Sequence, residues 1–337
     1  MDATDALTEI AFWLERDLAP VFKVRAFRTA AAAIAELSPA ELAERAADGR
    51  LKDTKGIGGR TFEVIRQALD GDVPDYLAGL RETGAKPLAE GGEELLALLR
   101  GDLHCHSEWS DGTTPIADMV QTARSLGRDY LALTDHSPRL RVANGLTAER
   151  LAEQLDVVAG INEGLDGFRL LTGIEVDILD DGALDQTDAL LERLDVVVAS
   201  AHSKLKMESP EMTERMIRAI RHPQTNVLGH VTGRLVEGSR GTRGESTFDA
   251  RAVFDACAAE DVAVEINSRP ERRDPPSRLV GVALEAGCLF SIDTDAHAPG
   301  QLDFLAYGAA RAAANGVPAD RIVTTWPLDR LTGWLRG

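Results

Sequence analysis

Residues 101–112 read GDLHCHSEWSDG, and this stretch decides how the rest of the chain is interpreted. Its beginning, Asp102–His106, predicts a short β-strand that contains two histidines, His104 and His106. The two lie two positions apart, and side chains at this spacing point to the same face of a strand. Both imidazole rings are therefore expected to reach a single metal ion from one side.

Short apolar runs and segments of helical periodicity alternate from residue 101 onward, which is typical of parallel β/α units. The predicted helices include Thr114–Leu126, Ala148–Leu165 and Ser209–Ile220. The predicted strands are Asp102–His106, Asp129–Asp135, Leu170–Val176, Val196–Ala201, Asn226–Val231, Val262–Ile266 and Leu289–Thr294. Seven strand–helix units in about 237 residues predict an α/β barrel somewhat short of the eightfold one. An open, doubly wound sheet is the alternative architecture.

Side chains that commonly bind metals gather at the carboxyl ends of these strands, where β/α barrels build their active sites. Six of the seven histidines lie there with two carboxylates, and a third carboxylate follows on the first loop. These residues are His104, His106, His136, His202, His230, His297, Glu175, Asp295 and Asp111. A lone histidine at a strand end is more often a hydrogen-bonded core residue, but so many potential ligands on one rim predict a metal site.

The ligand types also indicate which chemistry to expect. Mixed imidazole and carboxylate ligands suit Zn²⁺, Mn²⁺ or Fe²⁺, whereas so many histidines argue against Mg²⁺ or Ca²⁺. Two neighbouring ions can activate a water molecule as a nucleophile, so no serine or cysteine nucleophile is required, and Cys105 is expected to be a packing residue. Nearby carboxylates are expected to orient the histidines, namely Asp102, Asp135, Asp177 and Asp293.

Composition restricts the location and the partners of the protein. The three cysteines are scattered, which fits a reducing compartment better than a disulfide framework. No apolar run is long enough to cross a membrane, and the first residues lack the features of a secretory signal, so we expect a cytoplasmic protein. The net charge of −18 counts against an extended nucleic-acid surface but not against short contacts with DNA.

The first part of the chain is expected to be helical throughout. Ala6–Asp17 and Val24–Leu37 have apolar residues at helical spacing, Ser38 is placed to cap a helix that Pro39 opens, and a glycine-rich turn precedes Arg60–Asp70. We therefore divide the sequence into a helical domain at residues 1–81, a linker at 82–100 and a catalytic domain at 101–337.

The second part of the sequence resembles a known family. Seven motifs in order carry the resemblance: GDLHCHSEWSDG, LALTDHS, GIEVDI, ASAHS, LGHVTGR, EINSRPERRD and TDAH. They resemble the PHP (polymerase and histidinol phosphatase) domain, in the form found at the carboxyl end of bacterial X-family DNA polymerases. The resemblance covers residues 100–330 and implies a distorted seven-stranded β/α barrel in which nine residues hold three metal ions.

Every one of the nine ligand positions that the resemblance implies holds a competent ligand here: His104, His106, Asp111, His136, Glu175, His202, His230, Asp295 and His297. We hypothesise that Glu175 bridges ions and that His202 and His230 hold a third ion, and we assign the catalytic roles to Glu175, Asp295 and His136. Substrate phosphate is expected to contact residues after the fifth and sixth strands, namely Arg234, Asn267, Arg269 and Arg272.

The first 81 residues resemble the helical domain that begins X-family polymerases. Lys55, Gly56, Gly58 and Arg60 match its helix–hairpin–helix turn, whose backbone amides would hold a DNA phosphate, with Lys52 adding positive charge. The polymerase palm is missing between the two regions, because only about twenty residues join them. Val64 stands where the family has its Schiff-base lysine, so neither polymerase nor lyase activity is expected.

These observations predict a hydrolase that acts on phosphate ester bonds. The leading hypothesis is a DNA 3′→5′ exonuclease or end-processing phosphodiesterase involved in repair. The alternative is a phosphatase for a small metabolite such as histidinol phosphate or a nucleotide. A third possibility is a non-catalytic module that binds DNA and uses its metal ions structurally.

Overall fold

The computed structural model describes residues 1–238 and 241–336. The chain divides into two compact units, Met1–Pro87 and Leu88–Gly337. Among the described residues, no helix has both the length and the apolar character needed to cross a membrane.

The first unit is helical, as expected. Its helices are α1 (Ala3–Arg16), α2 (Val21–Ala35), α3 (Pro39–Ala47), the short 3₁₀ helix η1 (Arg50–Asp53), α4 (Gly59–Leu69) and α5 (Asp75–Gly84). The Ser38 hydroxyl accepts a hydrogen bond from the Glu41 amide and caps α3. Helices α1, α2 and α4 pack around a common core that includes Ile10, Ile34 and Ile65. The helix that Pro39 was expected to open begins at that residue, and the other three predicted helices begin one to three residues earlier than expected.

The second unit is built on a parallel sheet whose strands follow one another in chain order. The described strands are β1 (Gly101–Cys105), β2 (Tyr130–Leu133), β3 (Arg169–Asp177), β4 (Val196–Ser200), β5 (Val227–Leu228), β6 (Ala263–Asn267) and β7 (Phe290–Asp293). The sheet curls until its first and last strands meet, since Cys105 forms a parallel bridge with Ala296 and the His106 amide donates to the Ala296 carbonyl at 2.8 Å. The seven-stranded barrel is confirmed, and the open doubly wound sheet is wrong, because its strand order would reverse in the middle.

One predicted strand is much shorter than expected. Asn226–Val231 was predicted, but only Val227 and Leu228 belong to β5. Side chains make two of the hydrogen bonds beside it: the Val197 amide donates to the Asn226 side chain, and the His230 amide donates to the Glu265 carboxylate. The segment stays within the barrel wall, because the Asn226 and Gly229 amides still donate to the Val197 and Ala199 carbonyls of β4.

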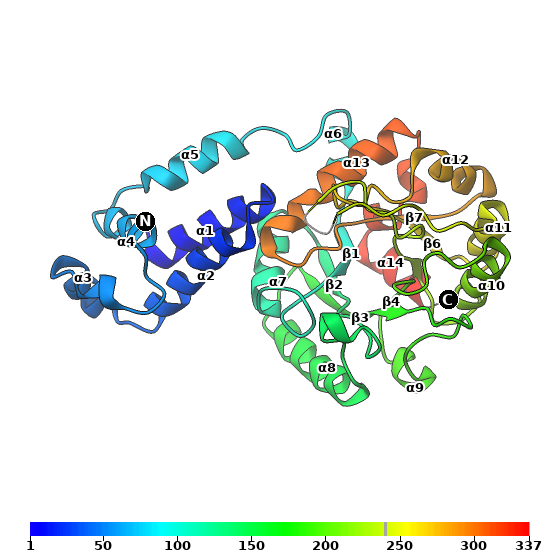
Figure 1. Ribbon diagram of the computed structural model, residues 1–337, viewed down its shortest axis with the longest axis horizontal. Helices are drawn as coiled ribbons and strands as arrows, with labels where there is room; N and C mark the ends of the chain where they lie inside the picture. Colours follow the sequence, from blue (N-terminus) through cyan, green and yellow to red (C-terminus); the bar gives the residue numbers. More distant parts are fainter. Residues whose placement is uncertain (239–240, 337) are drawn as a thin grey trace. The chain divides into compact units, whose positions relative to one another are not determined.

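Helices surround the barrel (Figure 1). They are α6 (Glu93–Leu98), α7 (Ile116–Ser125), α8 (Ala148–Glu163), α9 (Asp188–Leu191), α10 (Ser209–Ile220), α11 (Ala250–Ala259), α12 (Ser277–Ala286), α13 (Leu305–Ala314) and α14 (Leu328–Leu335), with 3₁₀ turns η2 (Arg141–Ala143), η3 (Pro299–Phe304), η4 (Ala319–Arg321) and η5 (Val323–Thr325). Helix α6 lies within the segment expected to be a linker, and it packs on α13. Gly92, just before α6, has no room for a side chain, because the Ala310 backbone would lie 2.3 Å from its Cβ.

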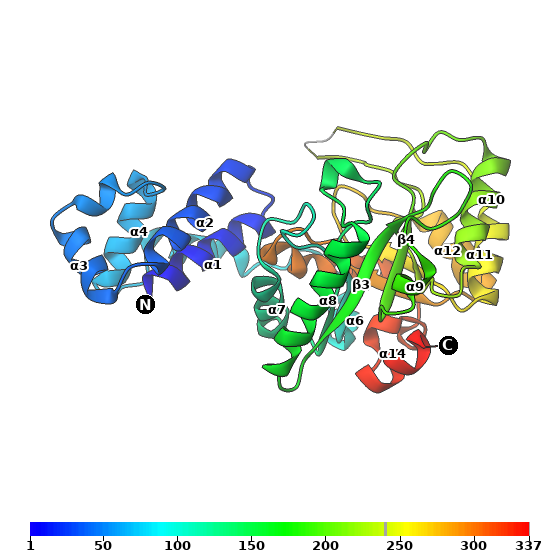
Figure 2. The same ribbon diagram turned by 90° about the horizontal axis from the view of Figure 1, so that it is seen from below.

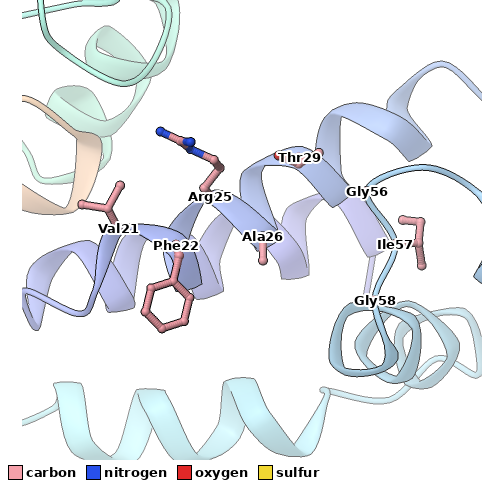
Figure 3. Close-up of a pocket in the computed structure, with 8 residues that line it drawn as sticks. All are labelled: Val21, Phe22, Arg25, Ala26, Thr29, Gly56, Ile57 and Gly58. Atoms are coloured by element: carbon pink, nitrogen blue, oxygen red, sulfur yellow. The ribbon is translucent and has the colours of Figure 1, made fainter.

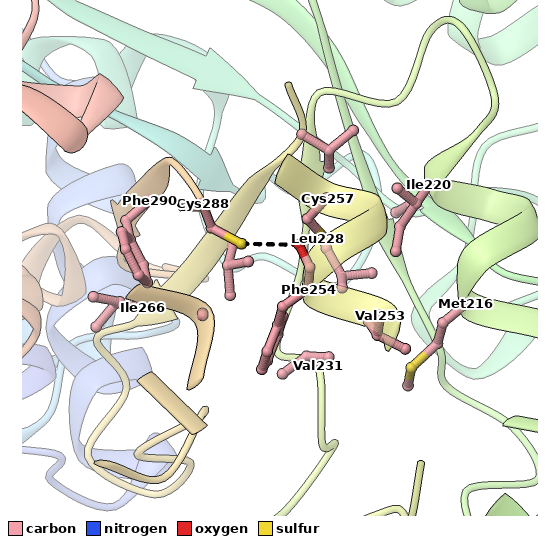
Figure 4. Close-up of a cluster of buried hydrophobic side chains, with 14 of the residues drawn as sticks. Met216, Ile220, Leu228, Val231, Val253, Phe254, Cys257, Ile266, Cys288 and Phe290 are labelled. Carbon is pink, nitrogen blue, oxygen red and sulfur yellow. Dashed lines mark hydrogen bonds between the residues drawn. The ribbon is translucent and has the colours of Figure 1, made fainter. Parts of the chain in front are cut away.

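The outer faces of the strands pack against the helices. Figure 4 shows part of this core, in which Phe254 and Cys257 of α11 belong to one buried cluster with Ile266 and Phe290 of the sheet. The Cys288 thiol donates to the Phe254 carbonyl at 3.2 Å. All three cysteines are buried and unpaired, so none forms a disulfide.

The amino-terminal end of the barrel is closed by the end of the chain. Helix α14 lies below the strands in Figure 2, opposite the long loops that follow them. Leu331 of α14 and Trp326 pack with Leu103, Tyr130 and other residues near the starts of the strands. The carboxyl ends of the strands are left to form the functional face.

Candidate metal centre

Glu175, the seventh residue of β3, lies at the centre of the histidine cluster. One of its carboxylate oxygens, Oε2, lies 3.4 Å from His104 Nε2, 3.6 Å from His106 Nε2 and 2.8 Å from His136 Nδ1. The other oxygen, Oε1, lies 3.2 Å from His202 Nε2 and 2.8 Å from His230 Nε2. One carboxylate thus faces five imidazole rings that come from four other strand ends.

A second group of ligand-type atoms forms beside the first. Asp111 folds back from the loop after β1, and its Oδ1 lies 3.4 Å from His136 Nε2 and 3.3 Å from His297 Nε2. His106 Nε2 lies 3.4 Å from Asp295 Oδ1, on the loop after β7. The structure therefore brings all nine side chains expected to bind metal to one rim, whereas His222 lies elsewhere and pairs with Asp188.

The spacing of these atoms suits bound metal ions. Two atoms that bind the same ion at about 2.1 Å lie roughly 3.0–3.5 Å from each other. Ligand atoms closer than 4.8 Å to one another form three groups: His106, Asp111, His136 and His297; His104, His106 and Glu175; and His136, Glu175 and His202. Neighbouring groups share His106, His136 or Glu175, which is the arrangement that a site for more than one ion requires.

Unpartnered polar atoms support the same interpretation. Buried nitrogens of five rings and one Glu175 oxygen lack a hydrogen-bond partner within the described part of the chain; these atoms are His104 Nε2, His106 Nδ1 and Nε2, His136 Nδ1, His202 Nε2, His230 Nδ1 and Glu175 Oε2. Burying a polar atom without a partner is costly, and most such atoms are satisfied in proteins. Several of these nitrogens lie as far from a carboxylate oxygen as two ligands of the same metal ion lie from each other. The residues therefore fit divalent metal ions.

The pKa values of the cluster favour ionised carboxylates. Burial raises the pKa of Glu175, but the charges of His202 and His136 outweigh it and hold that pKa well below its usual range. Burial and the neighbouring His297 lower the pKa of His106 to about 3, so this ring is neutral. Burial also lowers the pKa of His136, but Glu175 and Asp111 raise it to about 10. A metal ion that binds His136 must therefore displace a proton.

The carboxylates expected to orient histidines differ in what they contact. Asp177 Oδ1 lies 3.3 Å from His202 Nδ1 and accepts a hydrogen bond from the His202 amide, so it touches a ring. Asp102 accepts from the His104 amide and from Thr294, and Asp293 accepts from the Leu103 amide. Asp135 accepts from a set of side chains, Ser107, Ser110 and Gln154. These three fix the backbone and the loops under the rim.

Sequence reasoning did not single out Glu265. This residue of β6 is fully buried, and its Oε1 lies 2.5 Å from His104 Nδ1. The sequence held a signal for it: Val262, Val264 and Ile266 pack outward against the helices, so Glu265 had to point into the barrel. A carboxylate at an inward position of a parallel strand has no solvent to face and needs partners there.

The residues expected to bind substrate phosphate all have protein partners. Arg272 donates Nε to Asp295 Oδ2 at 2.9 Å, and Arg269 donates to the Asp295 carbonyl at 3.0 Å. Asn267 donates to Glu265 and Asp295. Arg234 donates to the carbonyls of Arg272 and Arg273. Contact with substrate stays a prediction for these four residues, and their observed partners belong to the rim and its loops.

The glycine turn of the first unit lies beside a pocket (Figure 3). The pocket has a volume of about 710 Å³ and is lined by Val21, Phe22, Arg25, Ala26 and Thr29 of α2 and by Gly56, Ile57 and Gly58. Gly56 has φ +94°, and a Cβ there would come within 2.7 Å of Thr29, so only glycine suits this position. Lys55 and Arg60 lie outside the lining, and Arg60 stacks over the Tyr76 ring.

Fold and cluster together define a metal-binding β/α-barrel protein. Residues 102–269 match the family model described as the PHP domain. The chain belongs to the PHP domain family, whose members are metal-dependent phosphoesterases that hydrolyse phosphate ester bonds.

Curated relatives carry several activities in their names. The chain is 34% identical over 241 residues to "DNA polymerase/3'-5' exonuclease PolX" of Bacillus subtilis (strain 168), an alignment that covers 72% of this chain and 42% of that protein. The chain is also 26% identical to a "Probable phosphatase" of Caldicellulosiruptor saccharolyticus, over 59% of this chain and 80% of that protein. The alignment with PolX thus spans less than half of the polymerase.

A solved structure resembles the chain at lower similarity. It is the histidinol phosphate phosphatase of Lactococcus lactis complexed with zinc, L-histidinol and phosphate, at 17% identity and a TM-score of 0.46. The match covers 64% of this chain and 92% of that one.

Proposed function

We propose that the protein is a metal-dependent phosphodiesterase that acts on DNA ends, as a 3′→5′ exonuclease or an end-processing enzyme. The observation that carries the proposal is the convergence of nine imidazole and carboxylate side chains, with Glu175 at their centre, on one rim of the barrel. Such a cluster exceeds what one structural ion needs, since structural zinc sites use four ligands.

The chemistry follows from the types of ligand. Divalent ions held at this rim, three in our proposal, would lower the pKa of a water molecule and neutralise charge on a phosphate group. Zinc, manganese and iron all suit these ligands. Glu175 presents both carboxylate oxygens to histidines and is suited to bridge ions. We assign the catalytic roles to Glu175, Asp295 and His136. His202 and His230 would hold the third ion.

Protein nucleophiles are poorly placed for this reaction. Burial raises the pKa of the Cys105 thiol well above its usual value, and the thiol donates to the Ala132 carbonyl. The hydroxyls of Ser107 and Ser110, on the loop after β1, both donate to Asp135. Attack by water therefore accounts for hydrolysis better than a covalent intermediate.

Two features favour DNA as the substrate. The chain is similar to PolX, whose name includes a 3′-5′ exonuclease. The first unit contains a glycine turn at the start of α4, and the amino-terminal end of a helix is suited to hold a phosphate; the turn lies next to a pocket with the exposed Phe22 side chain. A helical unit of this kind has no evident use in a phosphatase for small metabolites.

Two other features favour a small phosphate ester. The net charge of −18 opposes the approach of a polyanion. The arginines near the rim are engaged with protein partners, because Arg272 pairs with Asp295 and Arg234 donates to backbone carbonyls. A phosphatase for a nucleotide or a histidinol-phosphate-like metabolite is therefore the second candidate.

A direct comparison of substrates separates the two candidates. The protein is incubated with Mn²⁺ and a 5′-labelled single-stranded oligonucleotide, and in parallel with histidinol phosphate and a nucleoside monophosphate. Stepwise shortening of the oligonucleotide alone is the expected result. Phosphate release from a small ester alone would replace the proposal with the second candidate. Glu175→Gln, purified in the same way, controls for contaminating nucleases and phosphatases.

A further inference from the structure

The Glu265 carboxylate joins three strands beneath the metal centre. The side chain belongs to β6 and is fully buried. Its Oε1 lies 2.5 Å from His104 Nδ1 on β1. Its Oε2 accepts hydrogen bonds from the His230 amide after β5, at 2.5 Å, and from Asn267 Nδ2, at 3.2 Å. Both oxygens are thus occupied, and each serves a different histidine of the cluster.

A carboxylate oxygen accepts hydrogen bonds, and Oε1 lies within hydrogen-bond distance of the His104 ring nitrogen Nδ1. We therefore assign the proton between Glu265 and His104 to Nδ1. The lone pair of a neutral His104 ring then lies on Nε2, which faces Glu175 Oε2 at 3.4 Å and is buried without a hydrogen-bond partner. Nε2 is the nitrogen that a metal ion would use.

We propose that Glu265 is a positioning residue for the metal centre. It holds His104 in the form that carries its proton on Nδ1, and it anchors the backbone of His230, so that both rings present a nitrogen toward Glu175. The inference rests on the proposed metal-dependent function and goes beyond it, because it attributes part of the metal affinity of the site to a side chain that need not touch metal or substrate.

Among the described residues, no neighbouring carboxylate is placed to take over this task. Asp102 and Asp293 lie under the same rim, but they accept from the His104 and Leu103 amides and not from a ring. Asp177 contacts the His202 ring at a longer distance, 3.3 Å, and that ring is partly exposed. His104 is completely buried, so water cannot replace a missing acceptor without opening the barrel.

Glutamine at this position would retain the shape of the side chain but supply only one acceptor oxygen. Its amide group cannot accept from both the His104 ring and the His230 amide. If the oxygen keeps the His230 amide, the NH₂ group donates to His104 Nδ1 and moves the ring proton to Nε2, where it blocks the metal. If the oxygen turns to His104, the His230 amide has no acceptor. Either outcome disturbs one ligand.

The test measures metal binding directly. Metal-free wild type and Glu265→Gln are titrated with Zn²⁺ in competition with a chromophoric chelator. We expect Glu265→Gln to bind at least one ion 10- to 100-fold more weakly, the range found when partners of ligating histidines are removed. Excess metal should restore part of the hydrolysis. Equal affinities in the two proteins would overturn the proposal.

Asp274→Asn is the matched control. Asp274 is also fully buried and accepts hydrogen bonds from the Thr232 amide and hydroxyl; among the described residues it forms no hydrogen bond with an imidazole ring, and its charge reaches His230 only through space. We expect it to bind Zn²⁺ like the wild type, even if its melting temperature falls. A loss of affinity equal to that of Glu265→Gln would mean that any buried carboxylate has this effect, and the proposal would fail.

A second measurement does not depend on whether the variant folds. Nitrogen NMR of metal-free wild type, labelled at histidine, assigned with His104→Gln and recorded at a pH where this ring is neutral, should show His104 with its proton on Nδ1. A proton on Nε2 alone would refute the proposal. Failure of the proposed function is a separate result: a wild type that binds metal but hydrolyses no phosphate ester would leave the role of Glu265 in metal binding open to the same tests.

Discussion

Arg272 and Asp295 form a buried ion pair on the functional face, with Arg272 Nε 2.9 Å from Asp295 Oδ2. Burial raises the pKa of Asp295, but the Arg272 charge outweighs it and holds that pKa well below its usual range. Arg272 therefore keeps Asp295 ionised and fixes its second oxygen while Oδ1 faces His106. This ion pair gives Arg272 a role in shaping the metal centre, and that role does not depend on contact with substrate.

We expect Arg272→Ala to lower kcat and the bound metal content while it changes KM only slightly. Loss of the arginine leaves a buried carboxylate without its partner, which typically costs about 3–5 kcal/mol. Steady-state kinetics with bis(p-nitrophenyl) phosphate and metal analysis of the purified variant check this. A large rise in KM at unchanged kcat and metal content would instead support direct contact with substrate phosphate.

The proposed contact of the first unit with DNA is tested by reversing local charge. The triple variant Lys52→Glu, Lys55→Glu, Arg60→Glu should weaken oligonucleotide hydrolysis and reduce its salt dependence. The log–log slope should change by about 0.7 for each DNA phosphate that the variant no longer neutralises. Hydrolysis of bis(p-nitrophenyl) phosphate should stay unchanged. The control reverses Arg45, Arg66 and Lys86, which alters the net charge equally. Unchanged oligonucleotide hydrolysis in the first variant would exclude the proposed contact.

The buried thiols predict a pH dependence of stability. Burial raises the pKa of Cys288 to about 12 and raises those of Cys105 and Cys257 well above their usual value. The unfolded chain ionises its thiols near pH 9 while the folded chain keeps them protonated, so the free energy of unfolding should fall as pH rises above 9. Urea unfolding of wild type and Cys288→Ala at pH 8 and pH 10 measures this.

Thiol labelling checks the same burial independently. Native protein should react with a disulfide reagent very slowly at pH 8, and the unfolded protein should expose all three thiols. Rapid labelling of the native protein would show that at least one cysteine is accessible. An equal pH dependence in wild type and Cys288→Ala would remove Cys288 from the explanation.

The closed end of the barrel should matter for stability and not for chemistry. Leu331 of α14 is completely buried among residues at the starts of the strands. Leu331→Ala should lower the free energy of unfolding by about 2–5 kcal/mol and leave kcat and metal content unchanged. Leu98→Ala, at a position that is 52% exposed, is the control and should have an effect of less than about 0.5 kcal/mol. A parallel fall in kcat would contradict this division of roles.

The order of the elements could be predicted from the sequence because apolar runs alternate with helical segments throughout the second unit. The same alternation placed the histidines at the strand ends, and the distances around Glu175 agree with that placement. Strand length was harder to predict. Residues 226–231 look like one strand, but β5 contains only Val227 and Leu228, and the His230 amide bonds to the Glu265 side chain and not to a backbone carbonyl.

Side-chain contacts that depend on the path of a loop could not be predicted from the alternation of strands and helices. Arg272 and Asp295 lie 23 residues apart, and nothing in local spacing shows that the loop after β6 turns the arginine inward. Glu265 could have been found, because it interrupts an apolar strand at an inward position. Its contact with His104 across 161 positions required the closed barrel.

Removal and return of metal tests the central claim most directly. The protein is treated with a chelator, freed of it, and assayed with bis(p-nitrophenyl) phosphate while Mn²⁺ or Zn²⁺ is titrated back and bound metal is counted by mass spectrometry. We predict that hydrolysis disappears with the metal and returns as more than one ion binds per chain, and that Glu175→Gln recovers neither. Hydrolysis that survives complete removal of metal, or a chain that binds none, would contradict the account.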